Sequence, residues 1–250
     1  MKKYRITILV WLLILLIWNL ITYFKIVSTT LVPTPIDVLI TFQKIILNGY
    51  NGIPFWTHLG MTLWRLMIAI ILGILTGVPI GIFSGISITF YRIVDSIVQF
   101  YRPIPPLAYY TLLILWFGIG ETSKILLLYL AAFAPIYLAA LEGVHSVDEE
   151  YLLSGKSLGA DKLFILEHII FPAALPQIFT GIRTAVGVTF STLVSAEMVA
   201  SISGLGWMII DASKYLKSNV MFVGIILLGL IGYLIDIILK KIQKKYIFWN

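Results

Sequence analysis

A polar stretch between residues 153 and 172 carries the side chains of this sequence that are best placed to do chemistry or to bind a partner. Its Gly155-Lys156-Ser157 run resembles part of a phosphate-binding loop. A Walker A loop, however, needs a glycine five residues before its last glycine and a buried strand ahead of it, and Glu150 stands at that position. The stretch is therefore not expected to bind a nucleotide, and docking of a soluble protein is the better interpretation.

The same stretch is predicted to form two short helices that meet at a glycine. The first runs from about residue 149 to 158, and the second begins at Asp161, a favourable N-cap, and extends to Ile169. Gly159 lies between them, where a helix commonly ends on a glycine. Two helices bent in this way would form a compact knob between apolar segments; an ordinary polar loop is the alternative.

The remaining polar residues do not have the spacing of a catalytic or metal site. His58, His145 and His168 lie at the edges of apolar segments or within the polar stretch, without the spacing of metal ligands. Ser84 has no histidine at the same membrane depth to act as its base. The chain has no cysteine, which excludes thiol catalysis and disulfides. The chain is therefore predicted not to be an enzyme.

The composition predicts a membrane protein. Hydrophobic residues make up 60% of the sequence, charged residues 12%, and the mean hydropathy is +0.99. A soluble fold could not cover its surface with so few polar groups. At about 20 residues for each crossing, the chain provides about six spans. The net charge of +6 lies mostly at the ends of apolar segments, which indicates orientation in a lipid bilayer and not binding to nucleic acid.

We therefore predict an all-α membrane protein with about six transmembrane helices in one domain, residues 1–250. Residues 1–30 hold the first span, 31–56 an interfacial helix and an outer loop, and 57–250 the core with the polar loop at 144–172. Thr34 and Pro35 are expected to begin the interfacial helix. Prolines 103, 105 and 106 should divide the third span into two half-helices, because proline has no amide donor. The predicted spans cover residues 6–24, 57–83, 92–117, 124–141, 176–200 and 220–239.

Lysine and arginine residues predict the orientation, because they gather in cytoplasmic loops. With the N-terminus inside, the inner set is twice as large as the outer set. The inner set is Lys2, Lys3, Arg5, Arg92, Lys156, Lys162, Lys240, Lys241, Lys244 and Lys245, and the outer set is Lys25, Lys44, Lys124, Lys214 and Lys217. We expect a multi-pass protein of the cell membrane with both termini and the polar loop in the cytoplasm.

Polar side chains within the predicted spans are candidates for lining a path through the membrane. These candidates are Tyr109, Tyr110, Thr111, Thr189, Thr192, Ser195 and Glu197. Hydrogen bonding between helices is the alternative for any single hydroxyl. Arg65 and Arg183 could attract an anion, but pairing with a carboxylate or reaching to the interface is the favoured interpretation. Asp236 is expected to reach Lys240, one helical turn away.

A strict four-residue repeat of glycines marks the second predicted span. The repeat consists of Gly73, Gly77, Gly81 and Gly85. Glycines at this spacing lie on one helix face and let another backbone approach closely. Packing within one subunit is one interpretation, and a sliding or subunit-contact seam is the other.

The polar loop resembles the cytoplasmic EAA loop of ABC-importer permeases, because Gly159, Ile169 and Pro172 have its spacing. It departs from the pattern at residues 153–155, where Leu-Ser-Gly replaces Glu-Ala-Ala, and at Phe171, which replaces leucine. Other stretches resemble the nitrate, sulfonate, taurine and bicarbonate branch of these permeases. They are Leu-Val-Pro-Thr-Pro at 31–35, Arg-Pro-Ile-Pro-Pro-Leu-Ala at 102–108, Leu-Trp-Phe-Gly-Ile-Gly at 115–120, Pro-Ala-Ala-Leu-Pro at 172–176, Gly-Ile-Arg at 181–183 and Ser-Gly-Leu-Gly at 203–206.

The resemblance implies a type I ABC importer permease-like fold with a cytoplasmic coupling helix. It also implies a second copy of this chain, two cytoplasmic ABC ATPase subunits and an extracytoplasmic solute-binding protein. ATP and Mg would bind the ATPase, so this chain is expected to carry no cofactor, metal or catalytic residue of its own. The coupling residues would be Ser154, Gly155, Lys156, Leu158, Gly159, Ala160, Asp161, Ile169 and Pro172.

The implied function is passage of a small solute, with an oxyanion or organosulfonate (sulfonate, taurine, nitrate or bicarbonate) ranked first. A permease for a small heterocycle or vitamin precursor, of the riboflavin or thiamine-pyrimidine type, is the alternative. A secondary transporter is the alternative class. Such a protein normally shows inverted repeats and buried coupling acids, and no repeat is evident in this sequence.

Overall fold

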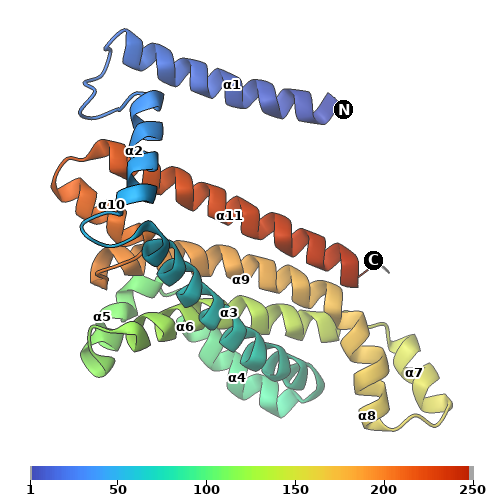
Figure 1. Ribbon diagram of the computed structural model, residues 1–250. Helices are drawn as coiled ribbons and strands as arrows, with labels where there is room; N and C mark the ends of the chain where they lie inside the picture. The colour runs from blue at the N-terminus through green and yellow to red at the C-terminus, as the bar shows by residue number, and fades with distance from the viewer. Residues whose placement is uncertain (1, 248–250) are drawn as a thin grey trace. The chain divides into compact units, whose positions relative to one another are not determined.

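The computed structural model describes residues 2–247, with side chains from residue 5 onward, and this part of the chain is almost entirely helical (Figure 1). The side chains of Lys2 and Lys3, used above to predict the orientation, lie outside the described residues. The helices are α1 (Lys2–Tyr23), α2 (Pro35–Asn48), α3 (Phe55–Ile86), α4 (Ile88–Tyr101), α5 (Pro106–Phe117), α6 (Glu121–His145), α7 (Glu149–Ser157), α8 (Lys162–Ile165), the π-helical turn η1 (Leu166–Ile170), α9 (Phe171–Ala200), α10 (Leu205–Lys214) and α11 (Ser218–Tyr246). The predicted all-α fold is confirmed.

Five helical segments between residues 2 and 247 are long and apolar enough to cross a membrane. They are Arg5–Tyr23, Phe55–Ile86, Glu121–His145, Lys162–Ala200 and Ser218–Tyr246. The third predicted span is divided into α4 and α5, as the prolines between them predict, and α5 is a shorter apolar helix. About six spans are therefore found only if this broken element is counted with the five long ones.

The fifth predicted span begins earlier than expected. Helical structure runs without interruption from Lys162 through α8, η1 and α9, instead of beginning at Pro176. The π turn ends at Ile170, two residues before Pro172, whose missing amide would leave an ordinary α-helix without one of its hydrogen bonds. The second arm of the predicted coupling loop and the fifth span are consequently one continuous helical segment.

The chain forms two compact units, and the first combines residues 1–62 with 197–231. Within it, α2 begins as predicted: the Thr34 side chain accepts a hydrogen bond from the Asp37 amide at 3.1 Å, and Pro35 follows. Apolar residues of α2, α10 and the start of α11 share one core. The indole of Trp18 on α1 donates to the Pro33 carbonyl at 2.9 Å, which fastens α1 to the segment before α2.

The second unit combines residues 63–196 with 232–250, and α6 is its central helix. Residues of α6 share buried clusters with α3 and α9 on one side and with α4 on another. Gly143 of α6 contacts Ala174 of α9, where an added Cβ would lie 3.0 Å from the Ala174 Cβ. Gly181 of α9 contacts Ala139 of α6, where an added Cβ would lie 2.1 Å from the Ala139 Cβ. Small residues thus bring α6 and α9 into near backbone contact.

The glycine repeat of α3 packs against α6 within this second unit. A Cβ on Gly73 or Gly77 would lie 3.0 Å from Ala132 or Ile136, and one on Gly85 would lie 2.6 Å from Val144. At Gly81 it would lie 2.5 Å from the Tyr137 carbonyl oxygen and 2.6 Å from the Ala140 Cβ. Of the two interpretations of the repeat, packing within one subunit is the one that these contacts support.

Replacement of Gly81 by alanine is therefore expected to destabilise the chain. The new methyl group meets α6 backbone and forces α3 and α6 apart, at a cost of about 2 kcal/mol. Gly60→Ala is the matched control, because it lies on the same helix with nothing within 4 Å of its Cβ position. Thermal unfolding of both variants in detergent, followed by tryptophan fluorescence, should show a lower Tm for Gly81→Ala alone. Equal Tm values would mean that the repeat does not hold α3 against α6.

Candidate coupling loop and translocation cavity

The coupling loop begins with α7, which ends at Gly159 in a left-handed turn. The Gly159 amide donates to the Lys156 carbonyl at 3.0 Å, and the Ala160 amide donates to the Gly155 carbonyl at 3.0 Å. This pair of bonds is a Schellman motif, which satisfies the last carbonyls of a helix. It requires φ of +80° at Gly159, a conformation that residues with a Cβ rarely adopt. The predicted helix end at this glycine is confirmed.

The second arm of the loop begins at Asp161, as predicted. The Asp161 carboxylate accepts a hydrogen bond from the Phe164 amide at 2.7 Å and caps α8. The arm returns along α7, where Gly155 faces Ile169 so closely that a Cβ would lie 2.7 Å from its Cδ1 atom. The glycine at 155 thus has a packing role: it lets the two arms touch.

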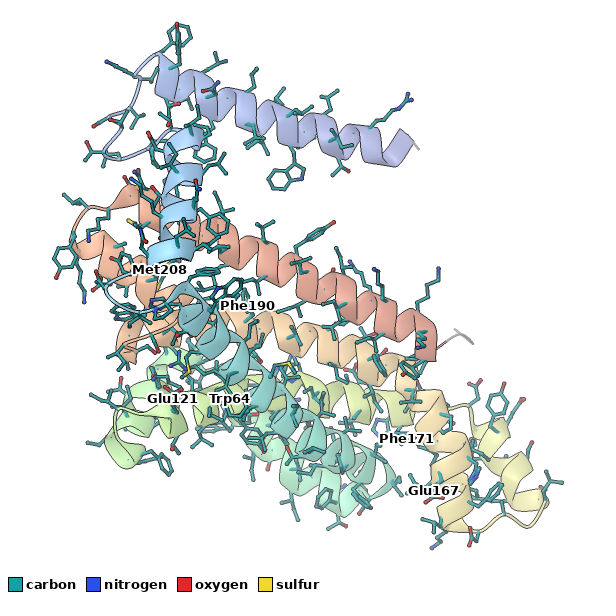
Figure 2. All side chains as sticks on the ribbon, in the orientation of Figure 1. Trp64, Glu121, Glu167, Phe171, Phe190 and Met208 are labelled. Carbon is teal, nitrogen blue, oxygen red and sulfur yellow. The ribbon has the colours of Figure 1, made fainter. Side chains whose placement is uncertain are left out.

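The tip of the loop exposes apolar side chains. Leu158 is 88% exposed, and Leu163, Phe164 and Tyr151 are also exposed. Between the arms lies a hollow of about 660 Å³, lined by Tyr151, Ser154, Gly155, Leu158, Ala160, Phe164, His168, Ile169, Pro172 and Ala173. Six of the nine predicted coupling residues line this hollow, and the other three are Lys156, Gly159 and Asp161. Figure 2 shows Glu167 and Phe171 on this part of the chain, with Glu121 at the opposite end of the second unit.

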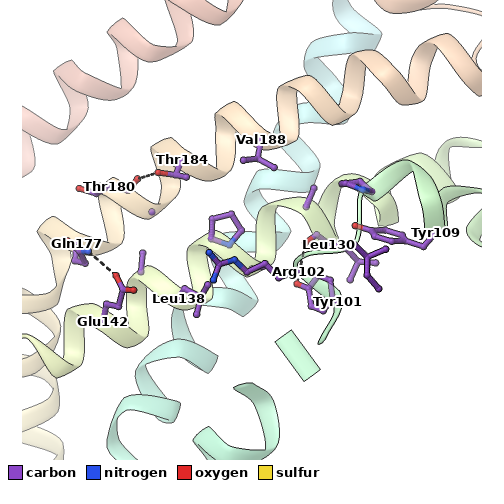
Figure 3. A pocket seen from close by; sticks show the side chains of 17 residues that line it. Tyr101, Arg102, Tyr109, Leu130, Leu138, Glu142, Gln177, Thr180, Thr184 and Val188 are labelled. Atoms are coloured by element: carbon purple, nitrogen blue, oxygen red, sulfur yellow. Dashed lines mark hydrogen bonds between the residues drawn. The ribbon is translucent and has the colours of Figure 1, made fainter. Parts of the chain in front are cut away.

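A second cavity, of about 440 Å³, lies between α6, α9 and the break that separates α4 from α5 (Figure 3). At one end, the Tyr101 hydroxyl donates to the Leu130 carbonyl at 3.3 Å. At the other, the Gln177 amide donates to the Glu142 carboxylate at 3.2 Å. Leu130 lies midway along α6 and Glu142 near its C-terminal end, so the cavity extends from mid-helix toward the coupling loop.

The predicted path residues are not brought together around this cavity. Tyr109 lines it, whereas Tyr110, Thr189 and Thr192 are buried in helix packing and Ser195 is half-buried. Thr111 is exposed elsewhere on α5. The hydroxyls of Thr192 and Ser195 donate to carbonyls of their own helix.

Sequence reasoning missed the face of α9 that does line the cavity. This face presents Gln177, Thr180, Gly181, Thr184 and Val188, at spacings of three and four residues. Exposed Ser191 continues the same stripe. The polar residues at this spacing were a signal in the sequence, but Thr189 and Thr192 form a competing polar face, and one residue along a helix rotates the side chain by about 100°.

Arg65 and Arg183 pair with carboxylates, as the favoured interpretation predicted. Arg65 is 1% exposed and donates to both oxygens of Glu121, at 2.6 and 2.8 Å. Arg183 donates to Asp236 at 3.1 Å, and Lys240 pairs with the other oxygen of Asp236. The bidentate Arg65 pair lies at the start of α6, where Lys124 also binds Glu121 at 2.9 Å.

Glu197 supports a loop of the first unit. It is fully buried, and its carboxylate accepts hydrogen bonds from the Thr62 hydroxyl at 2.9 Å and from the Gly206 amide at 2.9 Å. The Thr62 hydroxyl in turn accepts from the Leu205 amide at 2.9 Å. A Cβ on Gly204, whose φ is +124°, would lie 2.4 Å from the Glu197 carboxylate. The Ser-Gly-Leu-Gly loop therefore closes over this side chain.

These features define a class: the chain is a multi-pass helical membrane protein with an exposed apolar loop and a cavity between its helices. Over residues 77–248 the chain matches the family described as binding-protein-dependent transport system inner membrane component. The chain belongs to this family and is an ABC-importer permease. As a component of a binding-protein-dependent system, it is a membrane protein that works with a solute-binding protein and an ATPase.

Similar proteins include several named permeases. The chain is 40% identical over 241 residues to the taurine transport system permease protein TauC of Escherichia coli K12, covering 95% of this chain and 86% of TauC. It is 36% identical over 237 residues to the putative aliphatic sulfonates transport permease protein SsuC of Bacillus subtilis 168, covering 95% of this chain and 84% of SsuC. The methionine ABC transporter MetNI has the same fold, with a TM-score of 0.69 at 20% identity over 77% of this chain and 97% of that chain.

Loss of the Glu197 carboxylate is expected to unfold its loop. In Glu197→Ala, the Thr62 hydroxyl and the Gly206 amide lose their acceptor inside the protein, which should lower stability by about 3 kcal/mol. Ser195→Ala is the matched control, because its hydroxyl bonds only to its own helix. Thermal unfolding of the two purified variants compares them directly. If Glu197→Ala unfolds at the wild-type temperature yet no longer transports, the residue acts in the path and not in the loop.

Proposed function

We propose that this chain is the membrane subunit of an ATP-driven importer of a small organosulfonate or oxyanion. The observation that carries the importer mechanism is the exposed apolar tip of the coupling loop, since exposed leucine and phenylalanine side chains that are grouped on a loop mark an interaction surface. The named cargoes of similar proteins, taurine and aliphatic sulfonates, support the substrate class. The hydroxyl-lined cavity of the second unit also supports it.

The working complex in this proposal contains two copies of the chain, two ATPase subunits and an extracytoplasmic solute-binding protein. ATP and Mg bind to the ATPase subunits, and this chain hydrolyses nothing. An exposed stripe on α9, formed by Thr184, Val188 and Ser191, supports a second copy of the chain facing it across the path. Both compact units act in one permease domain that spans residues 1–250.

The orientation in this proposal has both termini and the coupling loop in the cytoplasm. The excess of lysine and arginine on that side supports it. Lys156 and Lys162 lie in the coupling loop, and Lys240, Lys244 and Lys245 lie on the last turns of α11.

Transport in this proposal depends on movement of α9. ATP-driven closure of the ATPase subunits would displace the coupling loop, and the uninterrupted run from Lys162 would carry the displacement to the cavity wall at residues 177–188. Tyr109 belongs to the path in this account, together with Thr180, Thr184 and Val188. The other predicted path residues, Tyr110, Thr111, Thr189, Thr192, Ser195 and Glu197, would move with the helices without touching the solute.

Replacement of Gly159 by leucine is expected to disconnect transport from the ATPase. Leucine at a φ of +80° costs about 1 kcal/mol and shifts the turn that presents Leu158. The variant should reach the membrane in normal amount, retain little co-purifying ATPase and lose uptake into proteoliposomes.

Gly118→Leu is the matched control for this experiment. Gly118 also has a φ of +80° with open space around its Cβ position, but it lies between α5 and α6. It should suffer the same backbone strain and retain the ATPase at the wild-type ratio. Normal uptake by Gly159→Leu would contradict the assignment of this loop as the coupling element.

A further inference from the structure

One arginine that lines the cavity of the second unit has its charge available to a solute. Arg65 and Arg183 are paired with Glu121 and Asp236. Arg102 lines the cavity, and between residues 5 and 247 its guanidinium makes no hydrogen bond or ion pair. A cation within a membrane helix bundle is costly unless it faces a partner or water, so an unpaired one that faces a cavity indicates a functional site.

The proline break places Arg102 at mid-depth. Arg102 is the C-cap of α4, where its amide donates to the Val98 carbonyl at 2.9 Å, and Pro103 follows at once. The hydroxyl of its neighbour Tyr101 donates to the Leu130 carbonyl. Leu130 lies nine residues after Glu121, the first residue of α6, which is about 14 Å along the helix at 1.5 Å per residue. Figure 3 shows the Arg102 side chain between Tyr101 at one end of the cavity and Glu142 at the other.

Tyr109 supplies a hydroxyl donor in another part of the same cavity, on the side away from the Arg102 guanidinium (Figure 3). Its hydroxyl makes no hydrogen bond within the described part of the chain, although its side chain lines the same cavity. The hydroxyls of Thr180 and Thr184 already donate to backbone carbonyls of α9, at 3.0 and 3.1 Å, so they can only accept. Arg102 is therefore the charged donor that the cavity offers to an acceptor-only group such as a sulfonate, and Tyr109 and the second N–H of Gln177 are neutral donors.

Glu142 is the opposing charge in the cavity. The Arg102 side chain extends along the cavity toward Leu138 and Glu142 (Figure 3). Glu142 is exposed and already accepts a hydrogen bond from Gln177. Within the described residues it forms no ion pair with Arg102, so the guanidinium remains available to an anion.

We propose that Arg102 forms an oxyanion subsite along the translocation path, which binds the sulfonate or oxyanion group of the solute after the solute leaves the binding protein. The identity of the cargo rests on the proposed function, whereas the positive charge of the subsite does not. The planar guanidinium fork suits two oxygens of a tetrahedral or planar anion.

The charge of the subsite can be measured without transport, because the native chain has no cysteine. Thr184→Cys, in the complex with its ATPase, is labelled with the anionic 2-sulfonatoethyl and the cationic 2-trimethylammonioethyl methanethiosulfonates. Arg102→Gln should lower the ratio of the anionic to the cationic rate by about tenfold, as expected when one nearby unit charge is removed. Arg92→Gln, an exposed arginine of α4 outside the cavity, is the control and should leave the ratio unchanged. An unchanged ratio in Arg102→Gln would overturn the subsite.

Transport then tests recognition separately. With the ATPase and binding protein in proteoliposomes, Arg102→Gln should reduce uptake of taurine or ethanesulfonate by about tenfold or more. Arg102→Lys should retain the labelling ratio, because lysine keeps the positive charge. It should lose part of the uptake, because lysine lacks the planar fork of the guanidinium. Wild-type uptake by Arg102→Gln, despite a lowered labelling ratio, would also overturn the subsite. Failure of the wild-type complex to import either sulfonate would instead refute the proposed cargo, and the labelling ratio would still decide whether the subsite carries an available positive charge.

Discussion

The proposed mechanism depends on one continuous helical segment, Lys162–Ala200, that belongs both to the candidate coupling loop and to the wall of the cavity. Its first turns form the second arm of the loop, and its middle turns present Thr180, Thr184 and Val188 to the cavity. Gly143 of α6 and Gly181 of α9 bring the two helices into near backbone contact beside the cavity. A push on the loop is therefore expected to move the cavity wall and not to dissipate in a flexible linker.

The arginines of the helix bundle include two that are paired with carboxylates and one, Arg102, that lines the cavity without a partner. Arg65 and Arg183 are each fixed by a carboxylate, so they stabilise helix ends and helix contacts instead of attracting a solute. Glu197 is likewise committed to the Ser-Gly-Leu-Gly loop. Such commitments matter in a membrane protein, because an uncompensated charge is costly there. They make the free guanidinium of Arg102 stand out as a group with a different task.

Local signals in the sequence predicted much of this structure. Thr34 and Asp161 begin helices, Gly159 ends one, and the prolines after Arg102 break the third span, since each acts through its own backbone. The cavity-facing side of α9 could not be predicted, because two polar faces compete and only packing on α6 decides between them. Glu197 binds Thr62, which lies 135 positions earlier in the sequence, and Gly206, which lies nine positions later. No local sequence pattern predicts contacts between residues as far apart as Thr62 and Glu197.

The most direct test of the account is whether nucleotide bound to the ATPase changes access to α9. Val188→Cys, in an otherwise cysteine-free chain, can be labelled in the assembled transporter with a membrane-impermeant thiol reagent from either side of the membrane. The account predicts labelling from the cytoplasmic side without nucleotide and from the outer side after ATP and vanadate trap the ATPase. Labelling from the same side and at the same rate in both states would contradict it, because the helical run would then not connect the docking loop to the path.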